Sequence, residues 1–287
     1  MPSTLSNLLS RRPLTGYFVM CFALSWSWMA VTLGVLGRPM MGFAGTMATF
    51  VGPTLSALVM TAVTEGRAGV RALLQRLVLW RVAPVWYAVV LLGWPALLVL
   101  AALTRPEALV TLSVPTAALA ATYLFILVCG GPLGEEPGWR GYALPRLQER
   151  LTPLGGSLVL GALHGLWHLP IYLLVPGYNG APADVPGRGL AFATFVGGVT
   201  AGAVVFTWIY NNTHGSILLA VLYRATGNSL GVLAHELLPG LDVRDLLQAR
   251  PIAEIVLALL VIAVTRGRLN HDRLRPEPGD RVIRVRP

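Results

Sequence analysis

Long apolar stretches recur along the chain, and eight of them approach the length that crosses a bilayer. A hydrocarbon core of about 30 Å requires about 20 apolar helical residues. Charge-poor runs of this kind predict helices at residues 17–36, 40–64, 85–104, 114–133, 155–175, 189–210, 215–235 and 251–265. The eighth run is the shortest. The pattern therefore predicts an all-α, polytopic membrane protein with about eight transmembrane helices.

The connections between these runs are short, which leaves no room for a separate soluble domain. Residues 1–265 are predicted to form a single membrane-embedded domain, and the Arg-rich residues 266–287 a basic cytoplasmic tail. The first run should remain as a helix, because it is full-length and no small-residue cleavage site follows it. The two halves show no convincing internal repeat, which argues against a transporter.

Composition agrees with the membrane assignment, because 55% of the residues are hydrophobic and only 12% are charged. All 22 basic residues are Arg, which suggests a GC-rich bacterial source. The net charge of +9 does not indicate nucleic acid, since the Arg residues flank apolar segments. Their distribution predicts the bacterial inner membrane, with both termini cytoplasmic. Cys21 and Cys129 lie inside apolar runs and predict neither a disulfide nor a metal site.

The first polar motif lies at the end of the fourth predicted helix, in residues 134–142. Glu135 and Glu136 are adjacent carboxylates, and Arg140 follows Glu136 by four residues, so a helix would pair these two side chains. Pro137 removes a backbone donor beside them and predicts a local break. Taken alone, the cluster is typical of a charged loop at the membrane surface.

The second motif places His164 and His168 one helical turn apart in an otherwise apolar helix. Polar groups at that depth are costly and usually functional. Two imidazoles at this spacing can share a metal ion, and hydrogen bonding between helices is the structural alternative. The third motif places Arg224 and Asn228 on one face of the seventh helix, where a guanidinium must find a partner.

These three motifs, in this order, resemble the signature of the CAAX-protease and bacteriocin-processing family of intramembrane metalloproteases. The family pattern is Glu-Glu-x-x-x-Arg, then Phe-x-x-x-His, then His-x-x-x-Asn, and the resemblance covers about residues 120–235. The first element matches fully. His164 stands where the family has Phe, and Arg224 stands where it has a second metal-binding His.

The resemblance implies transmembrane helices that enclose a conical cavity open to the cytoplasm. It implies an endopeptidase in which Glu135 activates a water and His168 helps to bind zinc. Glu136 and Arg140 would give structural support, and Asn228 would steady the oxyanion. The expected partners are membrane lipid and a peptide or lipidated peptide, without nucleic acid.

Arg224 leaves three alternatives open, because a guanidinium stays protonated and cannot ligate a cation. His164 can compensate, so that Glu135, His164 and His168 form a three-ligand zinc site. Alternatively, Arg224 pairs with Glu135 or Glu136, which leaves a metal-free and non-proteolytic site. In the third alternative, Arg224 binds an anionic ligand such as a substrate carboxylate.

Two tryptophans and three further histidines complete the residues considered. Trp139 and Trp167 are candidates for a lipid or prenyl pocket, although interface anchors are the more usual role of such aromatic residues. The remaining histidines are expected to be non-catalytic because they lie at helix ends or in the tail: His214, His235 and His271.

Overall fold

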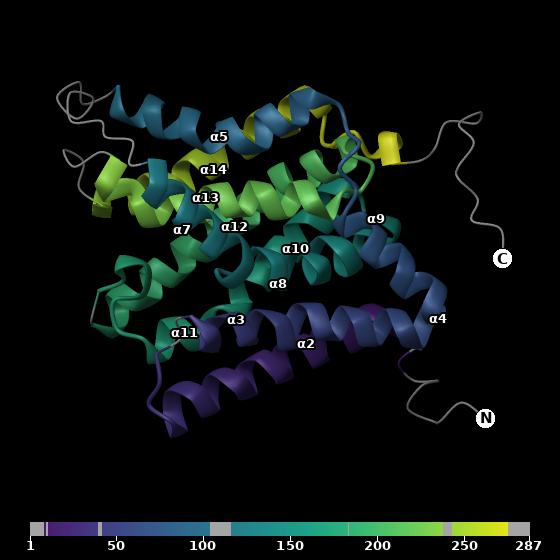
Figure 1. Ribbon diagram of the computed structural model, residues 1–287, viewed down its shortest axis with the longest axis horizontal. Coiled ribbons are helices and arrows are strands. Elements are labelled where there is room, and N and C mark those ends of the chain that lie inside the picture. The colour runs from purple at the N-terminus through teal and green to yellow at the C-terminus, as the bar shows by residue number, and fades with distance from the viewer. Residues whose placement is uncertain are drawn as a thin grey trace.

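The computed structural model describes residues 9, 11–39, 42–103, 116–182, 184–237 and 243–274, and these residues form helices and connections without a strand. The helices lie side by side along the long axis of the molecule (Figure 1). Five are long and apolar enough to cross a membrane: Pro13–Val35, Phe43–Leu77, Ala117–Arg150, Pro153–Leu174 and Val185–Asn212. Two shorter apolar helices are Pro84–Leu100 and Ile217–Leu233. The prediction of an all-α, polytopic membrane protein is confirmed.

Each predicted run coincides with a helical segment. In chain order these segments are α2 (Pro13–Met29) with η1 (Ala30–Val35), α3 (Phe43–Thr49) with η2 (Phe50–Thr54) and α4 (Leu55–Leu77), α5 (Pro84–Ala102), α7 (Thr116–Cys129), α10 (Pro153–Trp167) with α11 (Leu169–Leu174), α12 (Val185–Asn212), α13 (Ile217–Leu237) and α14 (Val243–Thr265). Short 3₁₀ turns occur at η4 (Tyr178–Gly180) and η5 (His271–Leu274).

The second helix is longer than predicted. The sequence pattern ended it at residue 64, whereas α4 continues to Leu77 through a bend at Gly66, whose φ is +66°. Beyond the bend the helix is amphipathic, with Gly69 and Leu73 buried and Arg67 exposed. A charge-poor run identifies only the part of a helix that crosses lipid. The prediction therefore ended before this charged, amphipathic extension of α4.

The helix that follows α7 is interrupted where the first motif lies. A turn at Gly131, whose φ is +103°, leads into α8 (Pro132–Glu136), the π-helix η3 (Pro137–Ala143) and α9 (Leu144–Arg150). The break expected at Pro137 therefore takes the form of a π-helical segment. Such segments are frequent at functional sites, because the extra residue per turn redirects the side chains around it.

Close packing of α10 on α12 positions the two histidines. Gly161 and Gly165 of α10 face Thr200 and Val196 of α12, and a Cβ at Gly161 would lie 2.5 Å from the Cα of Thr200. Small residues of this kind allow two membrane helices to approach closely. This close packing keeps the face of α10 that carries His164 in the interior of the bundle.

The start of α2 and the residues after α14 lie at the same end of the bundle as α9 and the end of α4 (Figure 1). The Tyr142 hydroxyl donates to the Pro13 carbonyl at 3.5 Å, and Asn211 donates to the Leu269 carbonyl at 2.9 Å. Leu269 is buried, so the predicted solvated tail is packed against α12 at its start. Residues 275–287 of that tail lie outside the described residues.

Candidate active site

Glu135, His164 and His168 meet inside the bundle, although they come from different helices. Glu135 lies near the end of α8, whereas His164 and His168 lie in the last turn of α10 and directly after it. One carboxylate oxygen and one nitrogen of each ring lie within 4.8 Å of one another. The His164 Nε2 atom lies 2.9 Å from the Glu135 Oε2 atom. All three residues are buried.

The orientation of His168 follows from its hydrogen bond. Its Nδ1 atom lies 3.0 Å from the backbone carbonyl of His164. A carbonyl oxygen can only accept, so Nδ1 carries the proton in the neutral ring and Nε2 keeps a lone pair. His168 also ends α10, and its backbone begins the short helix α11. The Nε2 lone pair is therefore available to a ligand, a metal ion or a water proton.

Glu136 is fully buried and lies between two guanidinium groups. The Nη1 atom of Arg140 lies 3.2 Å and 3.3 Å from its two oxygens, so the ion pair predicted from their spacing is confirmed. The Nε atom of Arg224 donates to the Glu136 Oε1 atom from α13. A buried carboxylate requires such partners, because isolated charges are very costly in an apolar interior.

Arg224 contacts more than one member of the site. Its Nη1 atom lies 3.4 Å from the Glu135 Oε2 atom, and its Nη2 atom lies 3.4 Å from the His164 Nδ1 atom. The side chain of Arg224 keeps 13% of its surface exposed. Arg224 thus bridges both carboxylates and one imidazole.

The charges of the site balance without any further ion. Glu135 and Glu136 contribute two negative charges, and Arg140 and Arg224 contribute two positive charges. Both guanidinium carbons also lie over the ring of Phe206, at 4.0 Å for Arg140 and 5.0 Å for Arg224. The sequence analysis missed Phe206, because an aromatic residue in an apolar helix carries no signal of a polar neighbour. Its negative ring face stabilises two buried cations.

Zinc fits this site in one respect and not in another. Two imidazoles and a carboxylate are ordinary zinc ligands, and their spacing here would admit an ion. However, a neutral His164 that ligated a metal through Nε2 would carry its proton on Nδ1, facing the donor-only guanidinium of Arg224. Arg224 would also oppose the ion by charge. The site with Arg224 in place therefore does not fit zinc.

Trp139 and Trp167 are buried in the interior, with exposed fractions of 0% and 2%. The Trp139 ring lies 4.9 Å from His164, and the Trp167 ring lies 4.8 Å from His168. Their favoured interpretation as interface anchors is wrong, because α2 covers them and Tyr17 packs on Trp139. A role in substrate binding stays a prediction for both.

Asn228 contacts the backbone of the turn that precedes α8. Its amide donates to the Gly130 carbonyl at 3.4 Å, at the turn before α8. Of the remaining histidines, His214 is exposed and His271 is partly buried, whereas the side chain of His235 lies outside the described residues. The conical cavity also stays a prediction.

The part of the chain that forms this site is similar to known proteases. Residues 116–230 match the type II CAAX prenyl endopeptidase Rce1-like family. This segment contains all nine candidate site residues and agrees with the range predicted from the motifs. The match supports the resemblance to the CAAX-protease and bacteriocin-processing family that the three motifs indicated.

A curated relative that the chain matches is also a CAAX prenyl protease. The chain is 28% identical over 101 residues to CAAX prenyl protease 2 of Methanococcus maripaludis. This alignment covers 35% of the chain and 36% of that protein, so the chain matches about a third of the relative's length. The likeness to this relative thus concerns a part of each chain and not the whole molecule.

Proposed function

We propose that the chain is an intramembrane endopeptidase in which Glu135 acts as the general base. The observation that carries this proposal is the convergence of Glu135, His164 and His168 within 4.8 Å inside the bundle. The similarity of this segment to CAAX endopeptidases supports the same reaction class. The substrate would be a peptide or lipidated peptide that reaches the site from the membrane.

Glu135 and His168 can hold the attacking water together. Each water proton would face one acceptor, a Glu135 oxygen or the Nε2 lone pair of His168. Glu135 takes one proton while the water oxygen forms a bond to the scissile carbonyl carbon. It then returns this proton to the departing amine nitrogen as the C–N bond breaks, so the carboxylate is regenerated. His164 holds Glu135 in place through the contact at 2.9 Å.

Arg224 supplies the charge that this reaction needs at the carbonyl oxygen. The attack creates an oxyanion, and a positioned cationic donor in a dry site stabilises it strongly. Arg224 is the more exposed of the two arginines, with 13% of its side chain exposed against 1% for Arg140. Asn228, one turn further along α13, would donate a second hydrogen bond. Glu136 and Arg140 give structural support to this arrangement.

We further propose that the protein lies in a bacterial inner membrane with both termini cytoplasmic. The start of α2, the end of α4, α9 and η5 share one end of the bundle (Figure 1). These elements and their flanks carry most of the arginines that the structure describes: Arg11, Arg12, Arg67, Arg71, Arg76, Arg81, Arg146, Arg150, Arg266, Arg268 and Arg273. Excess Arg is typical of the cytoplasmic side.

Cleavage of an internally quenched farnesylated peptide by the purified protein in proteoliposomes tests the proposal. Glu135→Gln should lower the rate about 10²- to 10⁴-fold, because it removes the base and leaves the shape unchanged. Glu65→Gln, at a half-exposed carboxylate of α4, should leave the rate unchanged. The zinc chelator 1,10-phenanthroline should also leave it unchanged. Loss of activity with the chelator would contradict a mechanism in which Glu135 and His168 hold the water without a metal ion.

A second candidate function is a binding protein without hydrolysis. It is favoured by one observation, since the Glu135 Oε2 atom already contacts both His164 and Arg224. An oxygen that two protein groups already contact is less accessible to the attacking water. This candidate predicts that the native protein does not cleave the peptide. It also predicts that the protein binds the peptide with a free terminal carboxylate more tightly than the same peptide with a terminal amide. Cleavage that depends on Glu135 would rule it out.

A further inference from the structure

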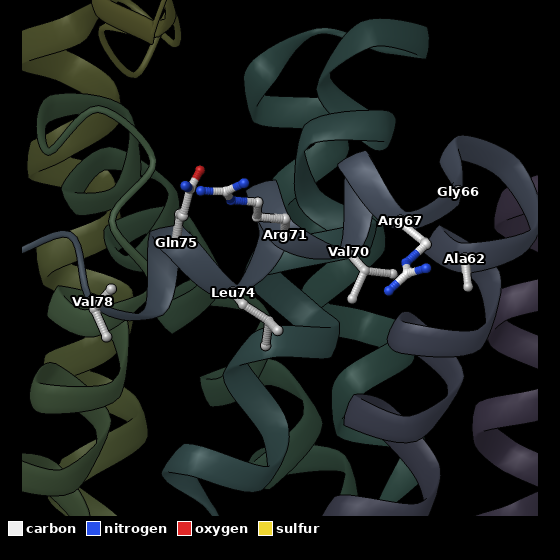
Figure 2. Close-up of a pocket in the computed structure, with 8 residues that line it drawn as sticks. All are labelled: Ala62, Gly66, Arg67, Val70, Arg71, Leu74, Gln75 and Val78. Carbon is white, nitrogen blue, oxygen red and sulfur yellow. The ribbon is translucent and has the colours of Figure 1, made fainter. Parts of the chain in front are cut away.

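A groove of about 580 Å³ follows an exposed side of α4 (Figure 2), and none of the candidate active-site residues is among the residues that line it. Two rows of side chains line most of it. The polar row is Arg67, Arg71 and Gln75, and the apolar row is Val70, Leu74 and Val78. Each row repeats every four residues, which places its members along one line of a helix. The groove therefore has a polar edge beside an apolar edge.

The two arginines of the polar row are available to a ligand. Arg67 and Arg71 are both exposed, and within the described part of the chain neither forms an ion pair. Among the described residues that line the groove, none is acidic. Arg76 of the same helix is different, because it turns inward and donates to the Tyr210 hydroxyl at 2.7 Å. The groove thus presents two like charges that no acidic residue in the described part of the chain pairs with.

The bend at Gly66 places this groove at the charged end of the bundle. Gly66 has φ +66° and ψ −161°, so the residues after it leave the direction of the first half of α4. Their opposite face is fixed to the bundle through Gly69 and Leu73, and Leu73 is 1% exposed. Because α9 and η5 share this end, the groove is expected at the level where headgroups meet acyl chains (Figure 1).

We propose that this groove binds an anionic phospholipid of the surrounding membrane. The lipid phosphate lies between Arg67 and Arg71, and one acyl chain follows Val70, Leu74 and Val78. Charge complementarity supports the headgroup, since guanidinium groups bind phosphate well and a basic segment at the membrane surface attracts anionic lipid. The apolar row supports a lipid over a soluble anion, because a free phosphate would leave it uncovered.

Titration of the delipidated full-length protein with phosphatidylglycerol and phosphatidylcholine, followed by native mass spectrometry, tests this proposal. The native protein should bind phosphatidylglycerol more tightly. The double variant Arg67→Gln with Arg71→Gln should weaken that binding roughly 10- to 30-fold, because each surface arginine contributes about 1 kcal/mol toward anionic lipid. Phosphatidylcholine binding should stay unchanged.

The matched control is the double variant Arg266→Gln with Arg268→Gln. It removes two exposed arginines from the same end of the bundle but outside the groove. We expect it to change phosphatidylglycerol binding less than 2-fold. An equal loss in both double variants would overturn the proposal, because the attraction would then be general surface charge. Displacement of the lipid by inorganic phosphate at equal concentration would also overturn it, in favour of a soluble anion.

Discussion

The interior charge cluster and the groove on α4 use the same residue type in opposite ways. Inside the bundle, Arg140 and Arg224 both pair with Glu136, Arg224 also contacts Glu135, and both arginines lie over Phe206. On α4, Arg67 and Arg71 are exposed and face no carboxylate in the described residues. Water and headgroups solvate an exposed guanidinium, whereas a buried one depends on protein partners. Burial, and not residue type, therefore decides what an arginine contributes.

The largest effect should come from Glu136→Gln, which keeps the shape of the side chain and removes its charge. Arg140 would then lose its carboxylate partner and Arg224 would keep only Glu135, so the free energy of unfolding should fall by about 3–5 kcal/mol. Unfolding in mixed micelles titrated with sodium dodecyl sulfate measures this change. The matched control is Glu65→Gln, which breaks the exposed pair with Arg146 and should cost about 1 kcal/mol or less. Equal losses would contradict the comparison.

The next effect concerns metal. Arg224→His removes the cation that faces Glu135 and His164 and adds an imidazole to the same site. Zinc affinity should rise on the order of 100-fold or more, because a unit charge at about 4 Å costs several kcal/mol toward a cation. Calorimetric titration with zinc measures it, and Arg250→His in α14 is the control. Tight zinc binding by the native protein would show that Arg224 moves aside, contrary to our interpretation.

A smaller effect is expected from Phe206→Leu, which removes the ring beneath both guanidinium groups. The free energy of unfolding should fall by about 2 kcal/mol, from lost cation–π contact and lost packing. The same unfolding titration applies. Phe125→Leu, at a residue of α7 that is 53% exposed, should change stability by less than about 0.5 kcal/mol. If the two variants behaved alike, the ring would have no special role beneath the charges.

The smallest effect should come from Arg67→Gln in lipid-free detergent. This guanidinium is exposed and unpaired in the described chain, so the free energy of unfolding should change by no more than about 0.5 kcal/mol. The contrast with Glu136→Gln then measures the cost of burial directly. A loss of several kcal/mol would show that Arg67 has a structural partner.

The sequence predicted the helices and the order of the motifs well, for a local reason. Each apolar run is recognisable from its own length and composition, so all eight predicted runs coincide with helical segments, five of which are long and apolar enough to cross a membrane. The pair of Glu136 and Arg140 was also predictable, because four residues separate them on one helix. The charged half of α4 was not predicted, because the charge-poor run ends where the first charges of this helix begin.

The class of the protein, its helices and most residues of the candidate site follow from local sequence patterns. The pairing of those residues depends instead on how the helices pack. Arg224 and Glu136 are 88 positions apart, and their contact exists because α13 and α8 pack together. The burial of Trp139 and Trp167 likewise depends on α2, which covers them from a distant part of the chain. Local sequence patterns do not show such neighbours, because contacts between distant segments form only when the helices assemble.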